Sequence, residues 1–203
     1  MDKGGWRRRL RAARAALPPG ERAAKAQRMV DHFFSLPEIA RAGSLNVLLY
    51  AAAGSEAPTK PLAGRLLRAG HRVFLPRLDR ERPGEMDVVP VSSWDELVPG
   101  PYFGIPQPPP DVPPVPPESL DAVVVPAVGF DRNGRRLGQG GGYYDRFFAR
   151  LPRRILRIGW AFSVQVVDEL PSEEHDQGVD LIVTEAGVVR PPGPPGLSAP
   201  RPS

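Results

Sequence analysis

The sequence contains no cysteine, only three lysines, and no apolar run long enough to cross a lipid bilayer. Without cysteine, disulfide bonds, thiolate metal ligands and a cysteine nucleophile are excluded. No lysine follows a glycine, so the Gly-Lys-Ser/Thr core of a P-loop is also missing. The first residues are charged and lack the apolar core of a secretory signal. We therefore expect a cytoplasmic protein with no membrane partner.

What the sequence does contain is ordinary for one globular domain. Its 203 residues are 41% hydrophobic and 25% charged, with a formal net charge of +4. Arginine supplies most of the positive charge, but no basic run is interleaved with aromatic residues, so we expect no nucleic acid partner. The arginine-rich N-terminal segment leaves one alternative open, a basic RNA-associated protein whose RNA binding is sensitive to salt.

Two proline-rich segments stand apart from the rest of the chain. Residues 106–117 contain too many prolines for a helix or a central strand, so we expect an extended crossing on the surface. Residues 190–203 are rich in Pro, Gly and Ser with a single leucine, and we expect a disordered tail there. The predicted domain therefore covers residues 1–189.

The first part of the chain predicts two helices. Apolar residues at helical spacing indicate a helix over residues 3–16 with a buried stripe of Trp6, Leu10, Ala13 and Leu17. Beside this stripe runs a basic edge of Lys3, Arg7, Arg11 and Arg14. We expect the last two of these, Arg11 and Arg14, to face solvent. Residues 18–21, Pro-Pro-Gly-Glu, end this helix and begin a second one, which ends near Pro37.

Strands and helices alternate over the rest of the chain. Strands are predicted at residues 45–50, 72–75, 86–91, 120–125, 155–161 and 180–184, and helices at 58–69 and 143–150. The strand at 72–75 is expected to stop at Pro76. This order indicates the α/β class: one three-layer α/β/α domain with a largely parallel sheet and an N-terminal helical pair. Ligands of such sheets bind at the carboxyl ends of the strands, where the loops after Tyr50, Val125 and Ala161 fall.

A glycine-rich segment at residues 131–146 is the most informative part of the sequence. It reads Asp131-Arg-Asn-Gly-Arg-Arg-Leu-Gly-Gln-Gly-Gly-Gly-Tyr-Tyr-Asp-Arg146 and lies between a predicted strand and a predicted helix. Glycines let backbone N–H groups approach a phosphate closely, and the start of a helix adds the positive end of its dipole. Positive charge comes from Arg132, Arg135, Arg136 and Arg146, while Asp145 is suited to hold a divalent cation. The segment predicts a nucleotide site, although the glycines alone fit a tight turn equally well. It is not a dinucleotide fingerprint, because Tyr143 stands where the third glycine is needed.

The complete segment resembles the signature of the 5-formyltetrahydrofolate cyclo-ligase family, also called 5,10-methenyltetrahydrofolate synthetase. The resemblance is carried by residues 125–131, Val-Pro-Ala-Val-Gly-Phe-Asp, and 137–145, Leu-Gly-Gln-Gly-Gly-Gly-Tyr-Tyr-Asp. Four further motifs follow the family order: Lys3-Gly-Gly-Trp6-Arg7, Glu56-Ala-Pro-Thr59, Phe103-Gly-Ile-Pro106, and His175-Asp176 with Val179-Asp180. The sequence departs from the pattern at Trp6, where leucine is usual, at Gln139, where tyrosine or arginine is common, and in the small residues Ala127 and Gly129.

This resemblance implies an ATP-driven ring closure. ATP phosphorylates the formyl oxygen of 5-formyltetrahydrofolate, the nitrogen at position 10 attacks the activated carbon, and phosphate leaves to give 5,10-methenyltetrahydrofolate. Phosphoryl transfer depends on positioning and charge stabilisation, so no covalent nucleophile is needed. A catalytically inactive relative that still binds folate or nucleotide remains the alternative. We expect a monomer whose partners are these two small molecules.

The resemblance also implies roles for individual residues. ATP is expected to contact Lys3, Arg7, Arg136, Leu137, Gly138, Gln139, Gly140, Gly141, Gly142, Tyr143 and Tyr144. The folate substrate is expected to contact Glu56, Gln139, Gly140, Gly141, Gly142 and Tyr143, with Glu56 accepting hydrogen bonds from the pterin ring. Mg²⁺ is expected as cofactor, held by Asp145 and Asp176. His175 is expected to be structural. One of Tyr143 and Tyr144 should pack inward and the other should face the ligand.

Overall fold

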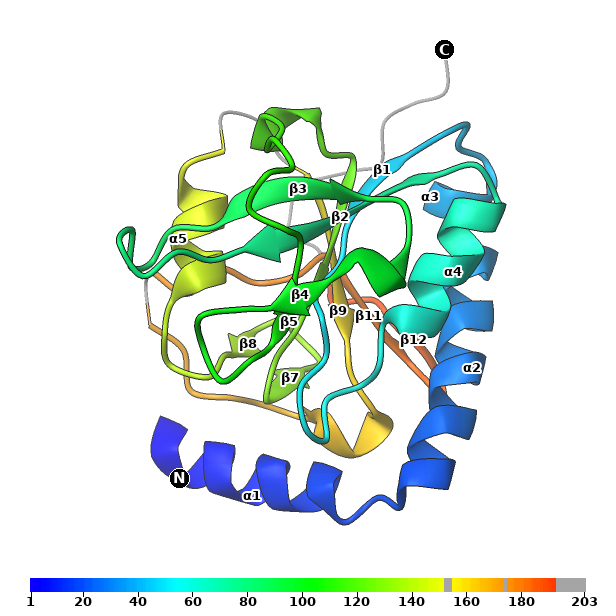
Figure 1. Cartoon of the computed structure of the whole chain (residues 1–203). Coiled ribbons are helices and arrows are strands. Elements are labelled where there is room, and N and C mark those ends of the chain that lie inside the picture. Colours follow the sequence, from blue (N-terminus) through cyan, green and yellow to red (C-terminus); the bar gives the residue numbers. More distant parts are fainter. Residues whose placement is uncertain (152–154, 174, 193–203) are drawn as a thin grey trace.

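The computed structural model describes residues 1–151, 155–173 and 175–192, and a seven-stranded sheet forms its centre (Figure 1). The strand order is β12-β11-β9-β6-β1-β2-β3. The strands are β1 (Asn46–Leu48), β2 (Arg72–Arg77), β3 (Asp87–Val91), β6 (Ala122–Val125), β9 (Leu156–Trp160), β11 (Leu181–Thr184) and β12 (Gly187–Val189). The five inner strands are parallel, whereas the edge strands β3 and β12 pair antiparallel with their neighbours. The predicted α/β class with a largely parallel sheet is confirmed.

Both faces of the sheet are covered, which gives the three predicted layers. Helices α2 (Pro19–Ser35), α3 (Pro37–Ala40) and α4 (Lys60–Arg68) cover one face, and α5 (Tyr143–Ala149) packs on the other (Figure 1). Successive residues of a strand point to opposite faces, so Val47 and Leu49 join the first core and Leu48 joins the second. All four residues of β6 are buried, as expected of a central parallel strand.

Both predicted N-terminal helices are present. Helix α1 (Lys3–Ala15) begins after Asp2, whose side chain accepts a hydrogen bond from the Gly5 N–H, and it crosses one end of the sheet (Figure 1). Leu10 of α1 packs in a small apolar cluster with Val128, Leu137 and Leu170.

The prediction that Arg14 faces solvent was wrong. Leu10 and Arg14 lie one helical turn apart on the same face of α1, so the packing that buries Leu10 also buries Arg14. Only 6% of the Arg14 surface is exposed. Arg11 is exposed, as predicted, while Trp6, Ala13 and Leu17 of the predicted buried stripe are half-buried.

The chain between β6 and α5 is more regular than the predicted loop. Strands β7 (Gly129–Asp131) and β8 (Arg136–Leu137) form a hairpin, and β10 (Val166–Val167) extends it to a three-stranded sheet. Asp131 is buried and accepts hydrogen bonds from the backbone N–H groups of Asn133, Arg135 and Leu170. Gly134 turns the hairpin with a φ of 80°, and a Cβ there would lie 2.6 Å from the Val179 carbonyl oxygen.

The prediction that Pro76 ends its strand was also wrong, since β2 continues to Arg77 and pairs Pro76 with Val88 of β3. Successive residues of a strand direct their backbone groups to alternate neighbouring strands. The Phe74 carbonyl accepts a hydrogen bond from the Leu49 N–H on the β1 side. Residue 76 therefore also points its backbone groups toward the β1 side, but the β1–β2 pairing ends at Leu48 and Phe74. The missing N–H of Pro76 therefore removes no hydrogen bond from the sheet.

The predicted crossing at residues 106–117 is mostly irregular, as expected. It begins with β5 (Pro106–Gln107), which pairs with β4 (Val98–Pro99), and it leads to a 3-10 turn, η2 (Pro117–Ser119). Two further 3-10 turns are η1 (Trp94–Glu96) and η3 (Ser163–Gln165). Of the predicted tail, only residues 190–192 are described, and Arg190 there forms a two-pronged ion pair with Glu38 at 2.7 and 3.0 Å. Residues 193–203 lie outside the described part of the chain.

Candidate functional site

A cavity of about 1340 Å³ opens at the carboxyl ends of the central strands. The chain runs from β1 outward through β2 and β3, and then returns to the other side of β1 with β6. The switch point of the sheet therefore lies between β1 and β6, where open α/β sheets bind their ligands. Every residue predicted to contact ATP, folate or magnesium lines this cavity, from Lys3, Arg7 and Glu56 through residues 136–145 to Asp176. Their individual roles remain predictions.

Helix α1 contributes one basic wall. Arg7 donates from Nε to the Gly138 carbonyl at 2.9 Å, and Arg11 donates to the side-chain oxygen of Gln139. Lys3 contacts Asp176 at 2.8 Å and Glu173 at 3.2 Å. Burial by itself lowers the pKa of Lys3, but the bonds to these carboxylates outweigh it and raise the pKa above its ordinary value. This wall holds fixed positive charge at the glycine loop.

The glycine loop lines the cavity and has backbone N–H groups without a partner among the described residues. Gly140 and Gly142 adopt positive φ angles of 110° and 65°, which non-glycine residues rarely adopt. The N–H groups of Gln139, Gly140 and Gly141 donate to no acceptor within the described part of the chain. Helix α5, which follows, has only seven residues. The loop amides, more than the short helix, are therefore the donors available to an anion.

Four arginines were predicted to supply positive charge to this segment. Two of them, Arg136 and Arg146, line the cavity. Arg136 bonds Asp145 at 2.6 Å, and Arg146 bonds the carbonyls of Gly84 and Gly141. Arg132 and Arg135 do not line the cavity, because the β7–β8 hairpin turns them toward Asp168 and Glu169 on the surface.

The two predicted metal ligands each use only one carboxylate oxygen in hydrogen bonds with the described residues. Asp145 accepts through Oδ1 from Arg136 and from the Gln177 N–H, and Asp176 accepts through Oδ2 from Lys3 and from the Glu173 N–H. Neither second oxygen accepts a hydrogen bond from a described residue. Burial by itself raises the pKa of Asp176, but the Lys3 ammonium and the Glu173 N–H outweigh it and hold that pKa below its ordinary value. Both carboxyl groups therefore fit an oxygen-preferring divalent cation.

His175 lies in the same part of the cavity as Asp176. Potential metal-ligating atoms of Glu173, His175 and Asp176 lie within 4.8 Å of one another, and Asp145 is outside this group. His175 is exposed and contacts Glu173 at 3.2 Å. His175 was predicted to be structural, and its contact with Glu173 indicates no catalytic role.

Glu56 lies on the turn that follows β1. Its Oε2 accepts from the Ala53 N–H at 2.9 Å, and its Oε1 lies 3.4 Å from the Gln139 amide nitrogen across the cavity. The turn is anchored to the core by Tyr50, whose hydroxyl donates to the Ala57 carbonyl at 2.7 Å. Burial raises the pKa of the Tyr50 hydroxyl well above its ordinary value, so it stays a neutral donor.

The two adjacent tyrosines both line the cavity but make different contacts, and the predicted division of roles between them stays a prediction. Tyr144 packs inward against Phe148, with ring centroids 6.2 Å apart, and burial raises the pKa of its hydroxyl. Tyr143 lies against the Arg146 guanidinium, 5.4 Å from its ring centroid. Interaction with the Tyr143 hydroxyl raises the pKa of the Tyr102 hydroxyl. Tyr144 is therefore the one of the two that also packs against the core.

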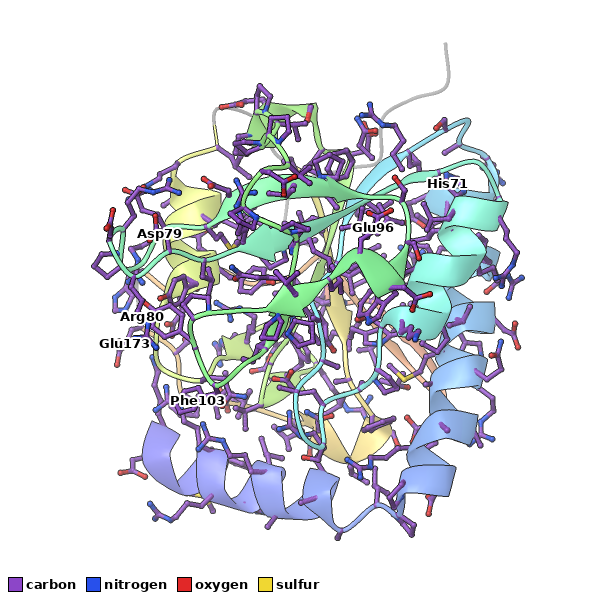
Figure 2. All side chains as sticks on the ribbon, viewed as in Figure 1. His71, Asp79, Arg80, Glu96, Phe103 and Glu173 are labelled. Atoms are coloured by element: carbon purple, nitrogen blue, oxygen red, sulfur yellow. The ribbon has the colours of Figure 1, made fainter. Side chains whose placement is uncertain are left out.

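Sequence reasoning missed an apolar part of the cavity wall. It consists of Leu78, Met86, Tyr102, Phe103 and Ile105. Phe103 is fully exposed on the turn between β4 and β5, with a positive φ of 54°, on the side of the molecule where α1 lies (Figure 2). The motif at residues 103–106 could have revealed this part of the wall, but no role was predicted for Phe103.

The fold and the cavity define an α/β protein with a basic, glycine-lined site at the switch point of its sheet. The sequence profile of the 5-formyltetrahydrofolate cyclo-ligase family matches residues 1–185. The chain belongs to this family, whose curated members are enzymes.

Individual relatives agree with this assignment. The 5-formyltetrahydrofolate cyclo-ligase of Escherichia coli strain K12 is 34% identical over 181 residues, covering 88% of this chain and 98% of the relative. The enzyme of the same name from Mycolicibacterium smegmatis is 34% identical over 70% of this chain and 75% of its own length. The solution structure of Aquifex aeolicus 5,10-methenyltetrahydrofolate synthetase aligns with a TM-score of 0.82 at 33% identity, covering 99% of this chain and 98% of that one. No described helix combines the length and hydrophobicity that a membrane crossing needs.

Proposed function

We propose that this chain catalyses the ATP-dependent cyclisation of 5-formyltetrahydrofolate to 5,10-methenyltetrahydrofolate, releasing ADP and phosphate. Family membership and the names of the relatives support the cyclo-ligase activity. One observation carries the ATP-dependent form of the proposal: basic side chains, free loop amides, two aspartates and Glu56 all line one cavity. That cavity is large enough for two substrates to meet, because single ligand sites usually measure about 300–1,000 Å³.

The proposed reaction has two bond-forming steps. The formyl oxygen attacks the terminal phosphorus of ATP, and ADP leaves. The nitrogen at position 10 then attacks the activated formyl carbon, loses its proton, and phosphate departs with the former formyl oxygen. Both steps require alignment of two anionic substrates, so the protein's main tasks are positioning and charge neutralisation.

The residues that suit the triphosphate are those that present positive charge or free N–H groups. Lys3 and Arg7 come from α1, Arg136 comes from β8, and the amides of residues 139–141 lie between them. Asp145 and Asp176 would hold Mg²⁺ through their open oxygens, and the bound ion would neutralise part of the charge on the triphosphate.

Other residues of the cavity suit the reduced pterin. The Glu56 carboxylate is an acceptor for ring N–H groups, and it is held in place by the Ala53 N–H. Tyr102, Phe103 and Ile105 supply the apolar surface that a ring system needs. Gln139 lies between Glu56 and α1, where the two substrates would face each other.

The direct test follows the absorbance of the methenyl product. Purified full-length protein, 5-formyltetrahydrofolate and Mg-ATP should give product and ADP in equal amounts. Folded protein that binds both substrates without making product would show that the chain is an inactive relative. Salt-sensitive RNA binding with no ATP consumption in the absence of RNA would support the basic RNA-associated alternative.

Replacing Asp145 by Asn should lower kcat at least about a hundredfold, because the substitution removes one charged magnesium ligand while keeping the side-chain shape. The assay is turnover against magnesium concentration, with the unfolding temperature as a check on the fold. Asp168→Asn is the matched control, since Asp168 is exposed and, among the described residues, is paired only with Arg132 at the surface. Unchanged turnover and magnesium dependence in Asp145→Asn would remove Asp145 from the proposed metal site.

A further inference from the structure

Arg14 is a nearly buried cation that the proposed chemistry leaves without a role. It lies in the last turn of α1, lines the cavity, and donates from Nε to the Ser55 hydroxyl at 3.0 Å. It forms no ion pair with any described residue. Burial lowers the pKa of the Arg14 guanidinium, and the nearby carboxylate of Glu56 partly offsets this effect. A charged group kept out of water without an ion pair is costly, so its position calls for a physical reason.

The partner of Arg14 is the neighbour of Glu56 in the chain. Residues 53–56 form a tight turn in which the Glu56 N–H donates to the Ala53 carbonyl at 3.1 Å and Gly54 has a φ of 58°. The Glu56 side chain caps the same turn by accepting from the Ala53 N–H. Fixing Ser55 therefore fixes the direction in which the Glu56 carboxylate enters the cavity.

The basic residues of α1 thus contact different parts of the cavity. Arg7 reaches the Gly138 carbonyl in the glycine loop, whereas Arg14, about 10 Å further along the helix axis, reaches the turn after β1. Loss of the Arg14 contact should therefore disturb the turn that carries Glu56 and leave the Arg7 contact with the glycine loop intact.

We propose that Arg14 is a positioning residue for the folate substrate, which holds the 53–56 turn through Ser55 and thereby orients the Glu56 carboxylate. This inference rests on the proposed function, because it takes Glu56 as the acceptor for the pterin ring. Arg14 itself need not touch the substrate. Arg14 reduces the conformational freedom of the Glu56 carboxylate, which contacts the substrate, and this lowers the entropic cost of binding.

The test measures dissociation constants of 5-formyltetrahydrofolate and of Mg-ATP by calorimetry on the full-length protein. Ser55→Ala removes the hydrogen bond and keeps the cation. It should weaken 5-formyltetrahydrofolate binding about three- to tenfold, the size expected for one hydrogen bond, and leave Mg-ATP binding unchanged. Arg14→Gln should weaken folate binding at least as much, and Arg14→Lys should restore part of the loss. At saturating folate, kcat should stay near the wild-type value in Ser55→Ala.

A second background separates positioning from a general effect on the fold. In protein already carrying Glu56→Gln, the Arg14→Gln change should add less than about twofold, because the group that Arg14 positions is no longer a carboxylate. Arg8→Gln is the matched control, since Arg8 is exposed on the same helix and does not line the cavity. Unfolding temperatures identify any variant that fails to fold. If Arg14→Gln fails to fold, the folate affinities of Ser55→Ala and Arg14→Lys test the inference.

Three results would overturn the inference while leaving the proposed function intact. The first is unchanged folate affinity in both Ser55→Ala and Arg14→Gln. The second is a loss in Arg14→Gln alone, which would mean that Arg14 contacts the ligand directly. The third is an equal loss of folate and ATP affinity. Wild-type protein that binds no 5-formyltetrahydrofolate would instead refute the proposed function and this inference together.

Discussion

At the level of single residues, two cations of the cavity are paired with its two aspartates. Lys3 contacts Asp176, and Arg136 contacts Asp145, each within 2.8 Å. We expect phosphate oxygens to compete for these cations, because they also form strong charge-assisted hydrogen bonds. Such an exchange would free carboxylate oxygens for a metal ion at the moment the triphosphate arrives. Each proposed metal ligand therefore lies beside a proposed phosphate ligand.

Glu56 carries the most specific prediction at this scale. Glu56→Gln should weaken 5-formyltetrahydrofolate binding about tenfold or more, because hydrogen bonds to a charged acceptor contribute about 1.5–3 kcal/mol. Mg-ATP binding should change less than about twofold, since the backbone of the glycine loop is unaltered. Calorimetric titration with each ligand separately measures both effects.

Glu81→Gln is the control for this measurement, because Glu81 is exposed and does not line the cavity. Equal losses of folate and ATP affinity in Glu56→Gln would show that Glu56 does not discriminate between the two ligands, contrary to its proposed role.

At the level of elements, buried polar contacts tie the helices to the sheet. Glu185, directly after β11, accepts from Lys25 of α2 at 2.8 Å and from the N–H and hydroxyl of Ser163 in η3. Burial by itself raises the pKa of Glu185, but the bonds from Lys25 and Ser163 outweigh it and hold the pKa below its ordinary value. This contact joins α2, η3 and the sheet without lining the cavity.

Glu185→Gln should lower the free energy of unfolding at pH 7 by about 2 kcal/mol, because a charge-assisted contact of a nearly buried group is lost. A carboxyl group whose pKa is lower in the folded state stabilises the fold above its unfolded pKa, and this stabilisation disappears as the pH falls through the folded pKa. The difference in unfolding free energy between wild type and variant should therefore be largest at neutral pH and become smaller below about pH 4.3. Urea unfolding at a series of pH values measures it, with exposed Glu169→Gln as control. A difference that is constant down to pH 2 would contradict the assigned pKa direction.

At the level of the whole molecule, the short apolar runs of the predicted strands and their alternation with helices were sufficient to predict the architecture. Residues 122–125 and 181–184 are continuous buried strands, and their alternation with helices predicted the parallel sheet. The cavity could be anticipated because parallel strands bring distant loops to the same edge. The family resemblance supplied the residues, and the sheet explains why Glu56 and residues 136–145 lie together.

What the sequence did not reveal depends on tertiary packing. Strands β7, β8 and β10 have two or three residues each, too few for any periodic signal. The burial of Arg14 follows from the helix face that it shares with Leu10 and from the turn after β1, which lies against α1. The position of that turn is not encoded in helical spacing. The apolar wall around Phe103 comes from segments that are irregular in the sequence and meet only in the fold.

The central claim is that one cavity holds both substrates in contact, and a crystal structure with a non-hydrolysable ATP analogue, Mg²⁺ and 5-formyltetrahydrofolate tests it most directly. The account predicts the triphosphate on the backbone of residues 139–141, the pterin on Glu56, and the formyl oxygen about 3–3.5 Å from the terminal phosphorus. A triphosphate bound away from these amides, or two ligands in separate places, would contradict it.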